Sequence, residues 1–188
     1  MKNTASLFFV LFSLSVGCFG QEPKPSPTGS ISDALSKKQP FTLRAESFSI
    51  QLPEPKEYVP SKPPSEGVEG KEGQASWELT EAFVFMIFGD MTPEKLATFS
   101  PEQRLKILSD GLRTMTEKDA TNITERDVTV NGFPAKEIRY TRDGKEYIGR
   151  ELFAGNRLFV FLAELHHVDN APSLVTRAFD SFEFVKNQ

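Results

Sequence analysis

Two runs of the chain are apolar on both faces of an extended strand: AFVFMIF, from Ala82 to Phe88, and RLFVFLAEL, from Arg157 to Leu165. Successive side chains of a strand point to opposite faces of a sheet, so a strand of this kind needs cover on both sides. The two runs therefore predict central strands of one sheet, with helices packed against both of its faces.

A helix and a meander of strands are predicted between these two runs. Ser100-Pro101-Glu102-Gln103 is typical of a helix start, with Ser100 as N-cap and Gln103 in the capping-box position, and leucines then recur at helical spacing to about Thr116. Asn131-Gly132 suits the positive φ angles of a tight hairpin turn, and further turns at 142–145 and 154–156 indicate antiparallel pairing.

The remaining elements complete one domain over residues 41–188. Short strands are expected at 48–52, 77–79 and 182–185, and a helix is expected after Asn170. The predicted fold class is α+β: a mostly antiparallel sheet with helices on both faces, which is a three-layer α/β/α sandwich.

The first twenty residues have the pattern of a signal sequence. One basic residue, Lys2, precedes an apolar run from Leu7 to Val16, and small residues follow. The run has about ten residues, whereas a membrane-spanning helix needs about twenty, so residues 1–20 predict export and not a membrane span.

Two cleavage sites remain open within this segment. Ser15-Val16-Gly17-Cys18 resembles the lipobox of bacterial lipoproteins, in which the cysteine becomes the lipidated first residue, although Ser15 stands where that pattern prefers leucine. Alternatively, cleavage after Gly20 would release a soluble chain that begins at Gln21. We favour lipidation of Cys18, because it lies at the end of the apolar run and a tether-like stretch follows it.

Two stretches predict irregular structure: one is rich in proline and serine, and the other in proline, lysine and glutamate. Residues 21–40 are expected to be a flexible tether, and residues 53–73 a disordered loop inside the domain, since neither stretch holds enough apolar side chains to offset the entropy of ordering.

Composition excludes several kinds of function. The net charge is -4 and no run of basic residues occurs, which argues against a nucleic-acid partner. Cys18 is the only cysteine, so the domain has neither a disulfide nor a thiolate metal site, and its stability must come from core burial.

Four segments within residues 41–187 combine turns with apolar core positions: FSIQLP, VNGFPAKEIRY, GRELFAGNRLFVFLAE and AFDSFEF. Together they resemble the PsbP-like (Mog-like) α/β/α sandwich found in small bacterial envelope proteins. Each segment consists of turns and core positions. The resemblance implies a non-catalytic domain that binds another macromolecule, and it assigns no functional residue in this chain.

His166, His167 and Asp169 form the one constellation that could bind a metal or serve an enzyme. Neighbouring residues at a strand end point to opposite sides, and zinc sites take three or four ligands, so surface residues are the simpler interpretation. No nucleophile elbow and no glycine-rich phosphate loop occurs. We therefore expect no catalytic, cofactor-binding or metal-binding residues.

These observations favour an exported, lipid-anchored binding or assembly module of a bacterial envelope over the alternative, a hydrolase or metal-dependent enzyme. An unidentified envelope protein is the expected partner, met by the 53–73 loop or by the sheet edge beside it. Tyr58, Val59 and Val68 are the apolar residues of that loop that could anchor such a partner.

Overall fold

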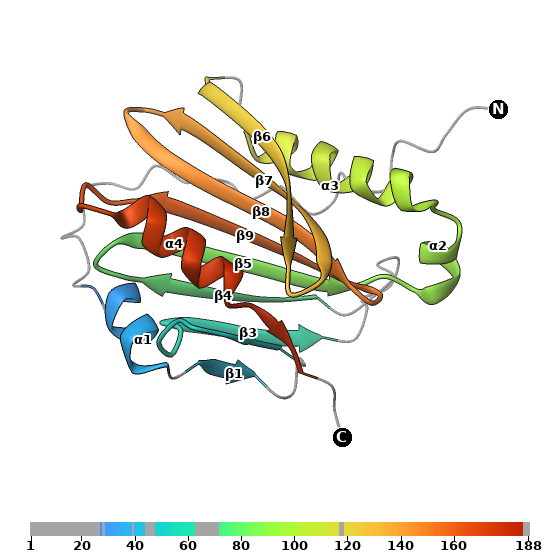
Figure 1. Cartoon of the computed structure of the whole chain (residues 1–188). Helices are drawn as coiled ribbons and strands as arrows, with labels where there is room; N and C mark the ends of the chain where they lie inside the picture. The colour runs from blue at the N-terminus through green and yellow to red at the C-terminus, as the bar shows by residue number, and fades with distance from the viewer. Residues whose placement is uncertain are drawn as a thin grey trace.

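A seven-stranded sheet forms the centre of the computed structural model, which describes residues 27, 29–38, 40–43, 48–62, 72–116 and 119–185. Its strand order is β3-β4-β5-β9-β8-β7-β6, and every pair of neighbours is antiparallel (Figure 1). The strands are β3 (Glu57–Lys62), β4 (Glu72–Glu78), β5 (Ala82–Asp90), β6 (Thr121–Val130), β7 (Phe133–Arg142), β8 (Lys145–Ala154) and β9 (Arg157–Leu165).

Within the described residues, short strands and four helices surround this sheet. A second sheet has the order β1-β2-β10. Its strands are β1 (Phe41–Leu43), β2 (Phe48–Ile50) and β10 (Glu183–Phe184), and the helices are α1 (Ile31–Lys37), α2 (Pro93–Ala97), α3 (Pro101–Met115) and α4 (Ala171–Asp180). The predicted α+β class with a mostly antiparallel sheet is confirmed.

The two apolar runs identified in the sequence lie side by side at the middle of the sheet. β5 pairs with β9 over nine residues, from Ala82 opposite Leu165 to Asp90 opposite Arg157. The predicted hairpin turn at Asn131-Gly132 joins β6 to β7, with φ angles of 47° and 86°. The expected central strands and the antiparallel meander are therefore both confirmed.

The main hydrophobic core lies between the sheet and the layer that contains α4 and the small sheet. Phe159 is fully buried on β9, and its ring lies 4.6 Å from that of Phe182 and 5.7 Å from that of Phe48. Phe161, two residues along the same strand, lies 5.1 Å from Phe179 of α4. We call this face of the seven-stranded sheet the α4 side.

The opposite face, called here the α3 side, is packed against α3. Leu112 of α3 joins a buried cluster with Ile138, Tyr140 and Tyr147 of β7 and β8. The predicted capping box starts this helix: the Gln103 amide donates to Ser100 Oγ at 3.2 Å, and the Ser100 amide donates to Gln103 Oε1 at 2.7 Å. Helices thus contact both faces, while the complete three-layer sandwich stays a prediction.

The structure corrects the expected tether. Residues 31–37 form α1, in which Ile31 is fully buried, and Gly29 forms a parallel bridge with Leu79. Glu81, itself only 3% exposed, holds the start of this helix: it accepts hydrogen bonds from Ser30 Oγ at 2.6 Å, from the Ile31 amide at 2.8 Å and from the Ser32 amide at 3.1 Å. Ile31 and Leu35 lie at helical spacing and are buried. Their burial offsets the entropy cost of ordering this segment, which the composition of residues 21–40 did not indicate.

The structure also corrects part of the expected 53–73 loop. Residues 57–62 form the edge strand β3, and β4 begins at Glu72. β3 pairs with β4 from Glu57 opposite Ser76 to Lys62 opposite Glu72, with an irregularity after Val59. Backbone pairing with a neighbouring strand orders this polar segment, and the loop's remaining residues, 63–71, lie outside the described part of the chain.

The first prediction concerns the core. Phe159→Ala should lower the free energy of unfolding by about 3–5 kcal/mol, because it removes a ring in contact with three other aromatic rings and leaves a cavity. Urea unfolding measures this change. Phe83→Ala is the matched control: this ring is 37% exposed on the neighbouring strand, so we expect a loss of about 1 kcal/mol. Equal losses of unfolding free energy in the two variants would show that Phe159 does not lie in the core.

The second prediction concerns α1. Burial opposes ionisation of Glu81, but the hydrogen bonds from Ser30, Ile31 and Ser32 outweigh it and hold the pKa of Glu81 below its usual value. Glu81→Gln should therefore cost about 1–3 kcal/mol at neutral pH. The difference from the parent should persist above pH 4.5 and vanish as the pH falls through the lowered pKa. Urea unfolding at several pH values tests this, with the exposed Glu94→Gln as control; a difference independent of pH would contradict it.

Candidate functional site: an apolar stripe on the α3 side

β5 presents three large apolar side chains on the α3 side of the sheet. Phe83 is 37% exposed, and Phe85 and Ile87 are half-buried, whereas Ala82, Val84, Met86 and Phe88 on the other side are fully buried. None of the three belongs to the buried hydrophobic clusters of the described residues. We call Phe83, Phe85 and Ile87 the β5 stripe.

The β5 stripe corrects the expectation that β5 is covered on both faces. The cluster under α3 takes its sheet residues from β7, β8 and β9. Figure 1 shows α3 beside the β6–β8 part of the sheet and away from β3 and β4. A helix is about 10 Å wide, roughly two strand spacings, so α3 is too narrow to cover a sheet of seven strands.

The strand register places a defined row of side chains beside each residue of the stripe. Phe83 lies between Glu78 of β4 and Glu164 of β9. Phe85 lies between Ser76 and Leu162, and Ile87 lies between Gln74 and Val160, with the outer residues again on β4 and β9. The stripe is therefore apolar along β5, bordered by small or polar side chains on β4, and acidic at the Phe83 end.

Two carboxyl groups, those of Glu164 and Glu78, lie at the acidic end of the stripe. Burial opposes the ionisation of Glu164, but the Lys145 ammonium at 2.5 Å and the Tyr147 hydroxyl at 2.9 Å both donate to it and keep its pKa below the usual value. Glu78 Oε1 lies 3.8 Å from His166 Nε2 on the other side of the phenyl ring. A ligand that reaches Phe83 therefore meets a carboxyl group on both sides, and that of Glu164 is paired with Lys145.

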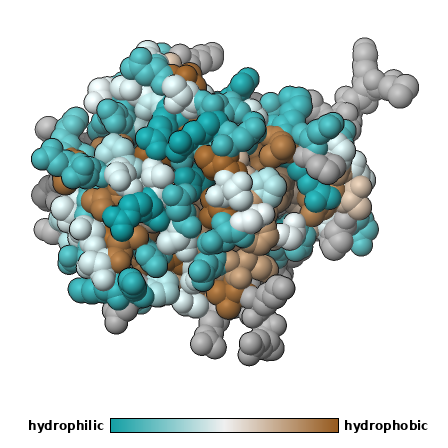
Figure 2. All heavy atoms as spheres, in the orientation of Figure 1, coloured by the Kyte–Doolittle hydropathy of each residue, from teal (hydrophilic) through white to brown (hydrophobic). Residues whose placement is uncertain are grey.

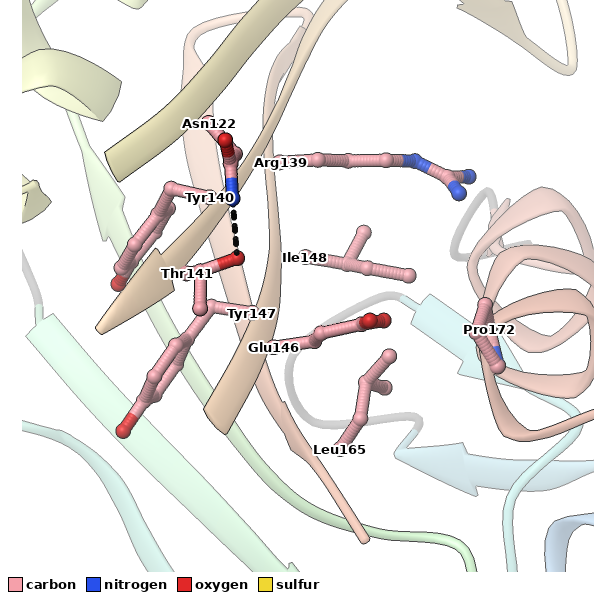
Figure 3. A pocket seen from close by; sticks show the side chains of 9 residues that line it. All are labelled: Asn122, Arg139, Tyr140, Thr141, Glu146, Tyr147, Ile148, Leu165 and Pro172. Carbon is pink, nitrogen blue, oxygen red and sulfur yellow. Dashed lines mark hydrogen bonds between the residues drawn. The ribbon is translucent and has the colours of Figure 1, made fainter. Parts of the chain in front are cut away.

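Two hollows lie elsewhere, at the N-terminal end of α4. One has a volume of 160 Å³ and a second has 410 Å³; Thr141, Glu146, Leu165 and Pro172 line both. Figure 3 shows Arg139, Ile148 and Glu146 pointing toward the first turn of α4, while the rings of Tyr140 and Tyr147 point the other way. The smaller hollow is below the usual size of a ligand pocket, and the larger is bordered by exposed turn residues.

His166, His167 and Asp169 all line the larger hollow. His166 Nδ1 lies 3.1 Å from the Thr80 carbonyl oxygen and its Nε2 lies near Glu78, so both ring nitrogens face protein groups. His167 and Asp169 are exposed. Among the described residues, no group of three or more histidine, cysteine, aspartate or glutamate side chains could hold a metal ion.

A buried ion pair joins the meander to α4 beside the smaller hollow. Arg150 and Glu137 are each 1% exposed, and Arg150 Nη2 donates to Glu137 Oε2 at 2.5 Å. Arg126 and Arg139 also donate to Glu137, and Arg150 donates to Asp180 of α4 at 2.7 Å. Burial opposes ionisation of Glu137, but these guanidinium groups keep its pKa below the usual value. The network fixes the position of α4 on the sheet.

The other predicted site residues are not brought together with the stripe. Tyr58 and Val59 lie on the edge strand β3, where Tyr58 is half-buried against the main core and Val59 is 36% exposed. Val68 and the predicted lipidation site Cys18 lie outside the described residues. On the face seen in Figure 2, which carries α4, hydrophobic residues reach the surface in separate patches between hydrophilic ones.

The sequence contains a signal for the stripe. Seven apolar residues in a row indicate a central strand, but the number of predicted helices limits how much of the second face can be covered. One long helix predicted before the meander is too narrow to cover the whole of that face.

Within the described ranges, no helix is long and apolar enough to cross a membrane.

A scan of the chain against protein-family models and a search of curated proteins found no match. Among solved structures, the chain is similar to a GTP-binding regulator from Thermotoga maritima, with 13% identity and a TM-score of 0.36 over 84% of this chain and 90% of that one. It is also similar to LpqN of Mycobacterium tuberculosis, which is involved in cell envelope biogenesis, with 15% identity and a TM-score of 0.30 over 88% of this chain and 100% of that one. At these scores neither similarity carries an argument about function, and the PsbP-like resemblance stays a prediction.

Proposed function

We propose that the protein is a non-catalytic binding or assembly module of a bacterial cell envelope, exported by its signal sequence and anchored through a lipid on Cys18. The observation that carries the binding role is the β5 stripe, in which Phe83 is exposed and the large apolar side chains of Phe85 and Ile87 continue the row as half-buried residues. Contiguous apolar surface on a soluble domain is typical of a protein interface.

The chemistry around the stripe defines the partner that it fits. An apolar helix face, about as wide as two strands, would lie beside α3 and cover β5. A basic residue at the end of that helix would meet Glu78 and Glu164 on either side of Phe83. The proposed partner is therefore a protein with an amphipathic helix that is basic at one end.

Site-specific photocrosslinking in the intact envelope tests this surface. A photoreactive side chain at Ser76, which lies opposite Phe85, should give an adduct with one partner protein, and the same group at the exposed Thr129 of β6 should not. Phe83→Ser should abolish the Ser76 adduct while the domain remains folded, because the ring is 37% exposed. Identical adducts from Ser76 and Thr129, or an adduct unaffected by Phe83→Ser, would refute the proposed interface.

The lipid anchor has its own test. Mass spectrometry of the native N-terminus should find a chain that begins with acylated Cys18. A chain that begins at Gln21 without an acyl group would eliminate the anchor and leave export and the proposed interface intact.

The alternative, a metal-dependent enzyme built on His166, His167 and Asp169, has less support, because both ring nitrogens of His166 face protein groups. A His166→Ala and His167→Ala double variant separates the two functions. Loss of bound metal or of the native phenotype, with the fold and the Ser76 adduct retained, would favour the enzyme over the binding module.

A further inference from the structure

Glu151 is a buried carboxyl group pressed against the backbone of α3. It lies on β8, on the α3 side of the sheet, and only 4% of its surface is exposed. A Cβ atom added to Gly111, in the middle of α3, would lie 2.6 Å from each of the two Glu151 carboxyl oxygens. Glycine disfavours a helix interior, so the space that this carboxyl occupies is a physical reason for Gly111.

The charged groups near Glu151 are engaged with other partners. Lys136 lies opposite Glu151 on β7, but its ammonium is 2.5 Å from Asp127 and 3.7 Å from Glu125. The other strand neighbour, Val160 of β9, carries no charge.

On α3 itself, Arg104 donates to the Leu96 carbonyl, Asp110 pairs with Lys106, and Arg113 pairs with Glu125. Among the described residues, Glu151 makes no hydrogen bond or ion pair of its own. Burial raises the pKa of Glu151 well above its usual value.

We propose that α3 is a proton-dependent cover of the sheet: it packs on β7 and β8 while the Glu151 carboxyl is neutral, and it loosens when that carboxyl loses its proton. A carboxylate without a partner between a helix and a sheet is strongly disfavoured, and movement of α3 lets water reach it. Loosening of α3 uncovers Leu162 and Val160, which lie directly beside Phe85 and Ile87. The proposal concerns α3 alone and does not rest on the proposed partner.

The direction of the pH effect follows from the two states of the carboxyl group. With α3 loosened, Glu151 titrates near the ordinary glutamate value; with α3 packed, it titrates at a higher pH. Below the ordinary value both states hold the proton, and pH has no effect through this group. Between the two pKa values, the equilibrium constant for packing of α3 falls by up to about tenfold for each pH unit. Above the raised pKa it falls no further.

Hydrogen exchange of the full chain between pH 5 and 8 tests the proposal. After correction for intrinsic exchange rates, opening of α3 at Leu108 and Leu112 should increase with pH in the parent and stay constant in Glu151→Gln. The amides of α4 provide an internal reference. Glu146→Gln, at an exposed position of the same strand, is the matched control and should keep the slope of the parent. A slope in Glu151→Gln equal to that of the parent would overturn the proposal, because a group other than Glu151 would then cause it.

A second pair of variants tests the contact itself. Gly111→Ala should speed opening of α3 at pH 5 in the parent, since its Cβ would collide with the carboxyl oxygens. In the Glu151→Ala background the same change should slow opening, because alanine favours the helix and the collision is gone. If Gly111→Ala slows opening in both backgrounds, the carboxyl does not lie on the helix and the proposal fails.

Discussion

The nine-residue pairing of β5 with β9 is the contact on which the rest of the structure depends. It joins the β3-β4-β5 hairpins to the β9-β8-β7-β6 meander across about seventy residues of sequence. Its register places Val84, Met86 and Phe88 beside Phe159 and Phe161 in the main core. Because side chains alternate along a strand, the same register puts Phe83, Phe85 and Ile87 together on the other face. The core and the proposed interface are therefore two consequences of one alignment.

Three buried glutamates show how their surroundings set the behaviour of one side-chain type. Glu81 accepts hydrogen bonds from the start of α1, and Glu137 is surrounded by arginine guanidinium groups; in both, these donors outweigh burial and the pKa is lowered. Glu151 is buried to a similar degree without such donors, and its pKa is raised. The Glu81 carboxylate stabilises the start of α1. The Glu137 carboxylate helps to fix the position of α4 through Arg150. The third couples the packing of α3 to protonation.

The two proposals concern the same face of the sheet. α3 covers the part formed by β7 and β8, and the β5 stripe lies in the part that the described helices leave open. Leu162 and Val160 of β9 form the boundary, since they contact the cluster under α3 and lie beside Phe85 and Ile87. A change in the packing of α3 would therefore enlarge the apolar surface that a partner meets.

Local periodicity and turn chemistry were enough to predict several features from the sequence. These are the central strands at 82–88 and 157–165, the capped start of α3, the Asn131-Gly132 hairpin and the antiparallel α+β class. The tertiary structure was needed to show that α1 and β3 are ordered, because α1 is held by Glu81 and β3 by its pairing with β4. It also decided which face of β5 stays open and that the carboxyl of Glu151 meets Gly111. The physical reason is that cover, burial and the pKa of a carboxyl group depend on neighbours that are remote in the chain, and a local pattern of residue types does not identify those neighbours.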